Sequence, residues 1–276
     1  MTHIGIIDLQ GGVVEHLEHL ERLGVPAVRV KEAADMQTLA GLIIPGGESS
    51  CLGRLLRLYG LDRAIRERFA AGLKLWGTCA GAILVAKQVD GEPAHLGLMD
   101  IDIQRNAFGS QLDSFHTKAE IPGVADHRLP LTFIRAPKIS RVGEGVRCLL
   151  HLQGHTRAGS QDNGEPFDGN SRSMGPGPAP DEAARAHPPG SLAPPSTTGG
   201  NRPMNQRGII EGTCGARHYY CAAAEDTQTL VTIFHPELTP DPAFHRYFCR
   251  KCGLSTRATP EVDWQRDSWT RFTPIP

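Results

Sequence analysis

The chain has 276 residues, of which 39% are hydrophobic, and it carries a net charge of −1 with a pI near 6.9. This balance leaves no basic surplus for nucleic acid or acidic lipid, and apolar runs of four to six residues are too short to span a membrane, which takes about 20. Seven scattered cysteines and an N-terminus without a signal pattern argue against a disulfide framework, so we expect a cytoplasmic protein.

The first part of the chain, residues 1–154, alternates between short apolar runs and stretches with helical spacing of apolar residues. We predict strands at 3–9, 27–30, 41–45 and 73–77, and helices at 11–23, 51–58, 61–71 and 80–87. This alternation indicates a three-layer α/β fold, with a mainly parallel sheet covered by helices on both faces. The runs at 99–104, 131–134 and 146–152 have no helices between them, so we expect an antiparallel extension at one sheet edge.

Residues 155–217 differ in composition from the rest of the chain. Eleven glycines and nine prolines fall in these 63 positions, with only six large apolar side chains. Such a stretch cannot bury enough surface to offset its chain entropy, and we predict a disordered insertion. We expect the domain to be completed by residues 218–252, with strands at 219–224 and 230–234 and a helix at 242–249. Residues 253–276 show no periodicity and are predicted to form a loose tail.

The segment Gly77-Thr78-Cys79-Ala80-Gly81 lies between a predicted strand and a predicted helix. It has the nucleophile-elbow pattern, with cysteine in the place of serine. Glycines permit the tight turn, and the positive end of the following helix favours the nucleophilic thiolate. The alternative is a buried structural cysteine in a glycine-rich turn, but the pattern favours a cysteine nucleophile.

The segment Phe234-His235-Pro236-Glu237-Leu238 follows a predicted strand. The proline biases His235 toward an extended backbone, in which residues two apart face the same side. Glu237 could then hold one imidazole nitrogen while the other faces a thiol, as in a nucleophile–base–orienter triad. Taken alone, the pair is more simply explained as a surface histidine and glutamate at a strand end.

A third segment, Pro45-Gly46-Gly47-Glu48-Ser49-Ser50, places two glycines after a predicted strand. Glycines let backbone N–H groups approach a ligand closely, so the N–H of Gly47 and that of Ala80 could hold a developing oxyanion. Taken alone, this segment is better explained as a strand-to-helix turn with Ser49 or Ser50 as the N-cap. The three segments together indicate a cysteine hydrolase much more strongly than any of them does singly.

The sequence resembles the class I (triad) glutamine amidotransferases, and most closely the glutaminase subunits of pyridoxal 5′-phosphate synthase. The resemblance covers nearly all of residues 1–154 and about 218–250. The segments that carry it are IGIIDLQGGVVEH, GLIIPGGESS, GTCAGAILVAK, HLGLMDIDIQRNAFGSQLDSF, FIRAP and FHPEL. Many amidotransferases share the elbow, whereas QRNAFGSQLDSF and FIRAP are far more specific to this subfamily.

The resemblance implies a role for each matching residue. Cys79 is the expected nucleophile, His235 the base and Glu237 its orienter. The residues expected to line the glutamine site are Gly47, Glu48, Ser49, Arg105, Ile134 and Arg135. Gln10 is expected on the oxyanion side and at the interface with a synthase barrel subunit, which would receive the ammonia. The resemblance implies no cofactor and no metal for this chain, because pyridoxal phosphate is the product of the partner.

Two features depart from the family pattern: the insertion at 155–217, and an end that runs through Cys249-Arg250-Lys251-Cys252 into the tail. A lone CxxC lacks the second ligand pair that zinc normally takes, so we expect two thiols at a helix end. Cys214 lies in an elbow-like GTCGA but has no strand before it, and we reject it as a nucleophile. Two alternatives stay open: the glutaminase subunit of another biosynthetic amidotransferase, and an impaired chain that only binds the synthase.

Overall fold

Five parallel strands form one half of the central sheet in the computed structural model, which describes residues 3–105, 114–154 and 218–259. Their order across the sheet is β2 (Ala27–Val30), β1 (His3–Ile7), β3 (Leu39–Ile44), β4 (Lys74–Thr78) and β13 (Thr229–Thr232). Each neighbouring pair among them is parallel. Ile43, Leu75 and Trp76 are fully buried, as expected where helices cover both faces of a sheet.

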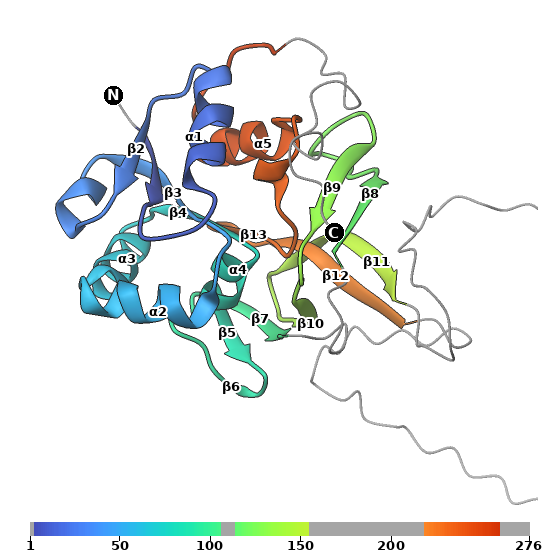
Figure 1. Cartoon of the computed structure of the whole chain (residues 1–276), viewed down its shortest axis with the longest axis horizontal. Helices are drawn as coiled ribbons and strands as arrows, with labels where there is room; N and C mark the ends of the chain where they lie inside the picture. Colours follow the sequence, from blue (N-terminus) through green and yellow to red (C-terminus); the bar gives the residue numbers. More distant parts are fainter. Residues whose placement is uncertain (1–2, 106–113, 155–217, 260–276) are drawn as a thin grey trace, which may run out of the picture. The chain divides into compact units, whose positions relative to one another are not determined.

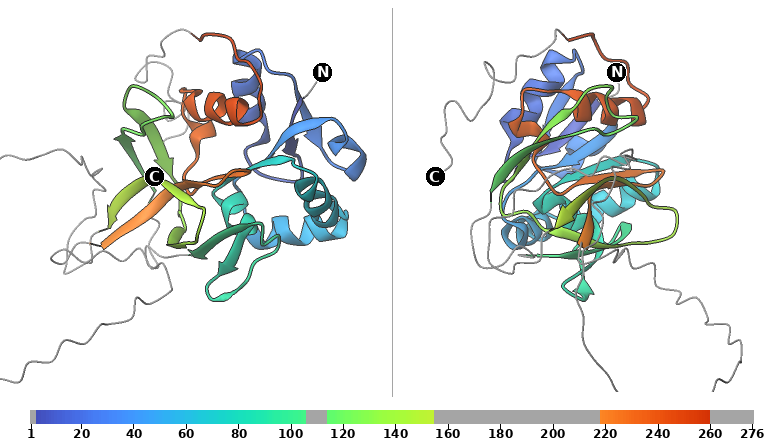
Figure 2. Two further views of the ribbon diagram at one scale, coloured as in Figure 1. Left: turned by 180° about the vertical axis from the view of Figure 1, so that it is seen from behind. Right: turned by 90° about the vertical axis from the view of Figure 1, so that its right-hand side faces the viewer.

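Helices cover both faces of this half of the sheet (Figures 1 and 2). One face carries α1 (Val13–Arg22) and α5 (Ala243–Lys251), and the other carries α2 (Ser49–Leu58), α3 (Leu61–Ala70) and α4 (Ala80–Val85). Two short 3-10 helices complete the set, η1 (Ala33–Met36) and η2 (Pro236–Leu238). The predicted three-layer α/β fold is therefore confirmed. No helix of the described residues is both long enough and apolar enough to cross a membrane.

The other half of the sheet begins with antiparallel strands, which confirms the predicted extension. The order continues from β13 through β12 (His218–Glu225), β10 (Lys138–Val142), β7 (Met99–Gln104), β5 (Ala86–Val89) and β6 (Glu92–Pro93). Strand β11 (Arg147–Gly154) pairs with β12 beside this path. A separate two-stranded sheet contains β8 (Phe115–Ala119) and β9 (Leu129–Phe133), so the predicted strand 131–134 does not belong to the main sheet.

The predicted helix 80–87 is too long. It ends at Val85, and the chain continues directly into β5 (Ala86–Val89), which runs parallel to β7. Ala86 and Val89 are buried, whereas Lys87 and Gln88 between them are exposed. Pairing with β7 and burial of these two apolar side chains outweigh the helix propensity of the segment, which the sequence pattern alone could not reveal.

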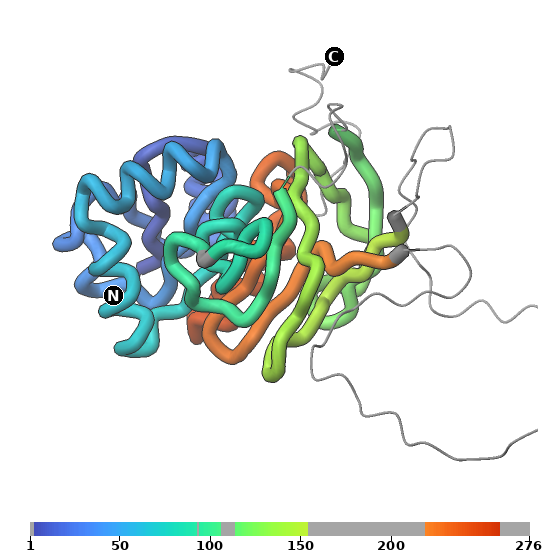
Figure 3. The backbone as a smooth tube through the Cα atoms, turned by 90° about the horizontal axis from the view of Figure 1, so that it is seen from below, coloured from blue at the N-terminus to red at the C-terminus, as the bar shows by residue number. Residues whose placement is uncertain are grey.

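The predicted insertion, residues 155–217, lies outside the described residues. The described residues that flank it are neighbours, because Gly154 at the end of β11 pairs with His218 at the start of β12, and the two strands run side by side (Figure 3). A disulfide joins Cys148 of β11 to Cys221 of β12, with Cα atoms 6.0 Å apart. The scattered cysteine spacing argued against a disulfide framework and did not predict this single bond, because the pairing of β11 with β12 decides which cysteines meet.

The predicted loose tail is described only as far as residue 259. In residues 253–259 the backbone N–H of Arg257 donates to the carbonyl oxygen of Leu23, at 2.8 Å, so this part of the chain packs beside the end of α1. The sequence did not predict this contact. Residues 260–276 and 106–113, the latter part of the QRNAFGSQLDSF segment, lie outside the described residues, as does Cys214.

Candidate active site

Cys79 occupies the sharp turn between β4 and α4. Its backbone has φ 46° and ψ −102°, in the left-handed half of conformational space, which a side chain-bearing residue adopts rarely. Neighbouring glycines permit the turn: a Cβ at Gly77 would meet the backbone of Gly81 at 2.6 Å, and a Cβ at Gly81 would collide with the carbonyl of Ile44. The strained elbow predicted from the sequence is therefore the observed geometry.

The backbone brings His235 to the same edge of the sheet. β13 lies beside β4, with Thr232 opposite Thr78, and the N–H of Cys79 donates to the carbonyl of Thr232 at 2.8 Å. His235 follows β13, so its side chain and that of Cys79 emerge at the carboxyl ends of adjacent parallel strands. This edge is where open α/β sheets place their sites.

His235 Nδ1 lies 2.7 Å from Oε1 of Glu237, whose side chain is 1% exposed. The sequence argument predicted this pair from extended backbone, but the backbone differs. Pro236–Leu238 forms a 3-10 turn with His235 as its N-cap, at φ −108° and ψ 85°. The turn, rather than a strand, folds the carboxylate back onto the imidazole.

The electrostatics of His235 favour the imidazolium. Burial alone would lower its pKa, but the charges of Glu237 and Cys79, and hydrogen bonds with both side chains, raise the pKa well above its usual value. Burial likewise opposes the charge of Glu237, yet His235 and His16 beside it lower the pKa of the carboxyl. A protonated imidazole beside a sulfur atom is the arrangement that supports a thiolate nucleophile.

The loop after β3 packs directly on this pair. A Cβ at Gly46 would collide with the His235 ring and would lie 3.3 Å from Cβ of Cys79, so only glycine fits there. The side chain of Gln10 donates from Nε2 to the carbonyl of Glu48, at 2.6 Å, and this bond ties the end of β1 to the same loop. The loop that contains Gly46 and Gly47 therefore lies beside Cys79, and Gln10 contacts this loop.

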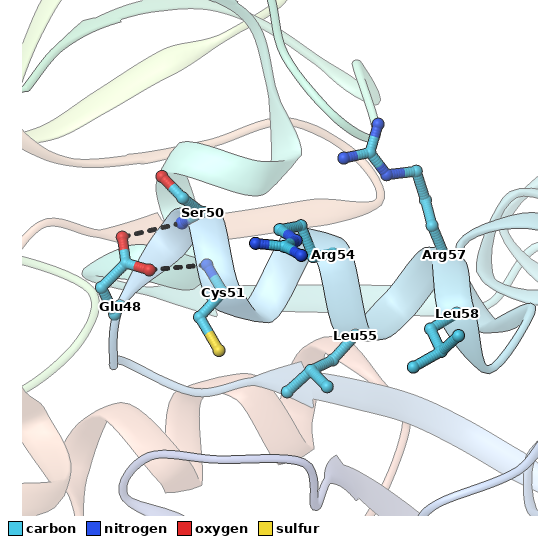
Figure 4. A pocket seen from close by; sticks show the side chains of 7 residues that line it. All are labelled: Glu48, Ser50, Cys51, Arg54, Leu55, Arg57 and Leu58. Carbon is cyan, nitrogen blue, oxygen red and sulfur yellow. Dashed lines mark hydrogen bonds between the residues drawn. The ribbon is translucent and has the colours of Figure 1, made fainter.

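Glu48 serves as the N-cap of α2. Its carboxylate accepts from the backbone N–H groups of Ser50, at 2.9 Å, and Cys51, at 2.6 Å (Figure 4), and these bonds lower its pKa. The cap is thus Glu48 and not Ser49 or Ser50, because an acidic side chain both accepts these bonds and complements the helix dipole. A pocket along α2 begins at Glu48 and is lined otherwise by Ser50, Cys51, Arg54, Leu55, Arg57 and Leu58. Cys79 and His235 do not line it.

The other residues expected to bind glutamine are Arg105, Ile134 and Arg135, and the structure gives each of them different neighbours. Arg105 lies close enough to Glu48 to lower the pKa of that carboxyl, and it forms an ion pair with Asp90, at 2.7 Å. Ile134 and Arg135 follow β9, whose residue Thr132 accepts a hydrogen bond from the N–H of His235 at 2.8 Å. Arg135 is exposed at φ 44°. Among the described residues it forms no ion pair, so its guanidinium is available to an anionic ligand.

Three buried histidines lie behind Glu237, and the sequence analysis did not find them. His16 and His19 come from α1 and His245 comes from α5. Nδ1 of His16 lies 2.8 Å from Nε2 of His245, and the ring of His19 stacks on that of His245 at 4.2 Å. The spacing of His16 and His19 on the apolar face of a helix was the available signal, but no pattern connects them to His245.

Burial keeps these three histidines neutral. It lowers the pKa of His16 and of His19 to about 4, and it lowers that of His245 well below the usual value. A folded-state pKa below the unfolded value means that the unfolded chain binds the proton first. Each such histidine therefore destabilises the fold as the pH falls from about 6.5 toward about 4.

We expect the free energy of unfolding to fall by about 1.4 kcal/mol per pH unit for each of these histidines in that window. Urea unfolding at pH 7, 6 and 5 measures the effect, above the range in which carboxylates titrate. His19→Leu should reduce the slope of unfolding free energy against pH by the contribution of one histidine. A stability that does not change between pH 7 and 5 would show that these side chains are not held neutral.

The CxxC at the end of α5 contains two thiols. Burial raises the pKa of both Cys249 and Cys252 to about 12, so both side chains are protonated near neutral pH in the metal-free chain. No group of three His, Cys, Asp or Glu side chains within residues 3–105, 114–154 and 218–259 is arranged to hold a metal ion.

Known proteins resemble this chain in sequence and in fold. The SNO glutamine amidotransferase family matches residues 6–164, more than half of the chain. A relative from Syntrophus aciditrophicus (strain SB), named pyridoxal 5′-phosphate synthase subunit PdxT, is 44% identical over 278 residues, covering 98% of this chain and 94% of the relative. A relative of the same name from Pasteurella multocida (strain Pm70) is 50% identical over 163 residues, covering 58% and 84%.

A solved structure described as a glutamine amidotransferase superposes with a TM-score of 0.62 at 31% sequence identity. The superposition covers 91% of this chain and 99% of the other. The sequence matches and the superposition thus agree on the same kind of protein. The chain therefore belongs to the SNO glutamine amidotransferase family.

Proposed function

We propose that the chain is the glutaminase subunit of a pyridoxal 5′-phosphate synthase, working in the cytoplasm and hydrolysing L-glutamine with Cys79, His235 and Glu237. The observation that carries the proposal is the bonded pair of His235 and the buried Glu237 beside a cysteine in a strained elbow. Relatives named as subunits of this synthase support the choice of pathway. The chemistry requires neither a metal nor a cofactor from this chain.

The reaction follows the logic of a cysteine hydrolase. Sγ of Cys79 attacks the side-chain amide carbon of glutamine, and the N–H groups of Gly47 and Ala80 hold the negative charge that develops on the amide oxygen. His235 gives its proton to the departing nitrogen, which leaves as ammonia, and a glutamyl thioester remains. His235 then removes a proton from water, and the resulting hydroxide attacks the thioester. The carbon–sulfur bond breaks, glutamate leaves, and Cys79 and the protonated His235 are ready for the next cycle.

Substrate binding is assigned to groups around the pair. The forked guanidinium of Arg135 suits the α-carboxylate of glutamine, because it can bind both oxygens. Glu48, Ser49, Arg105 and Ile134 complete the lining. Gln10 donates to the loop that contains Gly47 and lies on the expected synthase interface. Docking of a synthase subunit would therefore move this loop and align the N–H groups that bind the oxyanion.

The test is glutamate release from amide-¹⁵N-labelled glutamine, with and without a synthase barrel subunit and its pentose and triose phosphates. We expect the barrel subunit to raise glutamate release by about tenfold or more, the scale of an ordinary coupling between sites. The label should appear in pyridoxal phosphate in preference to free ammonia. A rate of glutamate release that is the same with and without the barrel subunit would favour the subunit of another biosynthetic amidotransferase. Binding to the barrel subunit without glutamate release would favour a non-catalytic partner.

A further inference from the structure

The second carboxylate oxygen of Glu237 faces a buried imidazole. Oε1 of Glu237 is held by His235, whereas Oε2 lies 3.7 Å from Nε2 of His16. Both side chains are essentially inaccessible to water, at 1% and 0% exposed. Neither of these two atoms has a hydrogen-bond partner elsewhere among the described residues. Two unsatisfied buried polar atoms 3.7 Å apart are each other's natural partners, because a buried polar atom without any partner destabilises the fold.

The contact between His16 and His245 decides which nitrogen of His16 carries the proton. If His16 donated from Nδ1 to His245, its bare Nε2 would face the carboxylate lone pairs. If His245 donates from Nε2 instead, Nδ1 of His16 accepts and its Nε2–H points at Oε2 of Glu237. The second arrangement also leaves Nδ1 of His245, which has no partner, as a bare acceptor instead of a buried donor. Donation therefore runs from His245 through His16 to Glu237.

The surroundings hold both rings in place. The ring of Trp76 packs edge-on against His16, at 5.5 Å, and against His245, at 4.9 Å. Apart from Glu237, the titratable groups that face this cluster are His19 of α1, His235 and Arg22, whose guanidinium donates to the carbonyl of Pro240. Among the residues that the structure describes, Glu237 is the one carboxylate that affects the pKa of His16, and none affects the pKa of His245.

A neutral donor suits this position for a chemical reason. A lysine or arginine behind Glu237 would neutralise its charge and weaken its hold on His235. An imidazole whose pKa is lowered to about 4 donates one hydrogen bond while leaving the negative charge for His235. Second partners of this kind fix the orientation of the group that touches the reacting atoms.

We propose that His16, with its proton placed by His245, is a positioning residue that holds Oε2 of Glu237 and so keeps His235 aligned with Cys79. The proposal rests on the proposed glutaminase function. It extends the triad inward by two residues, one from α1 and one from α5, neither of which touches the glutamine site.

The test compares His16→Leu, which removes the donor at similar volume, with His16→Gln, whose amide N–H can reach the place of Nε2. We expect His16→Leu to lower kcat for glutamine hydrolysis by roughly 10–100-fold. KM should not change, because His16 does not contact the substrate. His16→Gln should recover most of the loss, and His245→Leu should lower kcat less than His16→Leu does. His151→Leu, at an exposed position on β11, is the control.

A second readout does not depend on glutamine. The rate at which iodoacetamide alkylates Cys79, followed site by site in the full chain by mass spectrometry from pH 5 to 9, reports the state of the Cys79–His235 pair. In His16→Leu we expect slower alkylation at pH 7 and a shift of the alkaline transition of His235 to lower pH, with undiminished thermal stability. If His16→Leu matches the unmodified chain in both readouts, or if His16→Gln recovers nothing, the positioning role is wrong. An altered alkylation profile in a chain without glutaminase activity would instead retain the positioning role and reject the proposed function.

Discussion

Replacing Cys79 by alanine should abolish glutamate release and leave the fold intact. Loss of the nucleophile from a triad that acts as a unit costs about 10⁶ in kcat in a well-studied hydrolase, so we expect a loss of at least about 10⁴ here. The fold should persist because the substitution removes one sulfur atom and keeps a Cβ residue in the same φ 46° turn. Glutamate release in the presence of the synthase subunit measures the activity, and thermal unfolding measures the fold.

The matched control is Cys252→Ala, a half-buried thiol at the end of α5. It should leave glutamate release unchanged, which excludes a general effect of losing a thiol. Activity that survives in Cys79→Ala would mean that another group attacks the substrate, and the assignment of the elbow would then be wrong.

Replacing Glu237 by glutamine should lower kcat by about 10³–10⁴, even though the two side chains have nearly the same shape. In serine triads, a carboxylate-to-amide change at this position presents the wrong hydrogen-bonding partner to the histidine and costs about 10⁴. The same change removes the charge that raises the pKa of His235. His235 would then lose its proton at lower pH, so the alkaline limb of kcat/KM should move to lower pH.

The pH dependence separates this effect from simple instability. Glu225 is a suitable control, because it is also a buried carboxylate but is bonded to Arg147, Tyr247 and Lys251 instead. We expect Glu225→Gln to reduce stability while each folded molecule keeps its activity and its alkaline limb. A Glu237→Gln chain with wild-type pH dependence would show that Glu237 does not govern His235.

The local sequence was sufficient to predict the features that arise from neighbouring residues. The parallel strands were predictable because runs such as Leu42–Ile44 are apolar without alternation, and the elbow because glycines flank Cys79. The pairing of Cys79 with His235 was suggested by their two motifs together, but 156 positions separate them in the chain, so the family resemblance was needed to assign their roles. The residues proposed to bind glutamine likewise came from the family resemblance, because no periodic pattern in the sequence indicates them.

Other features depended on which segments meet. Strand β5 forms because β7 is there to pair with it, and the Cys148–Cys221 disulfide forms because β11 pairs with β12, with two register shifts between Cys148 and His151. Position 46 requires glycine because the imidazole of His235 packs against its backbone and leaves no room for a Cβ. None of these partners lies within a local window of the sequence, so neither propensity nor periodicity could have identified them.

The sequence alone determined the layer architecture, the strained turn at Cys79 and the presence of a His-x-Glu pair, because each arises from neighbouring residues. Only the tertiary structure decided what stands behind Glu237. His16 and His245 are 229 residues apart, and they meet because α1 and α5 pack on the same face of the sheet. Their burial, and with it their neutrality and the direction of their hydrogen bonds, is a property of that packing and not of either helix.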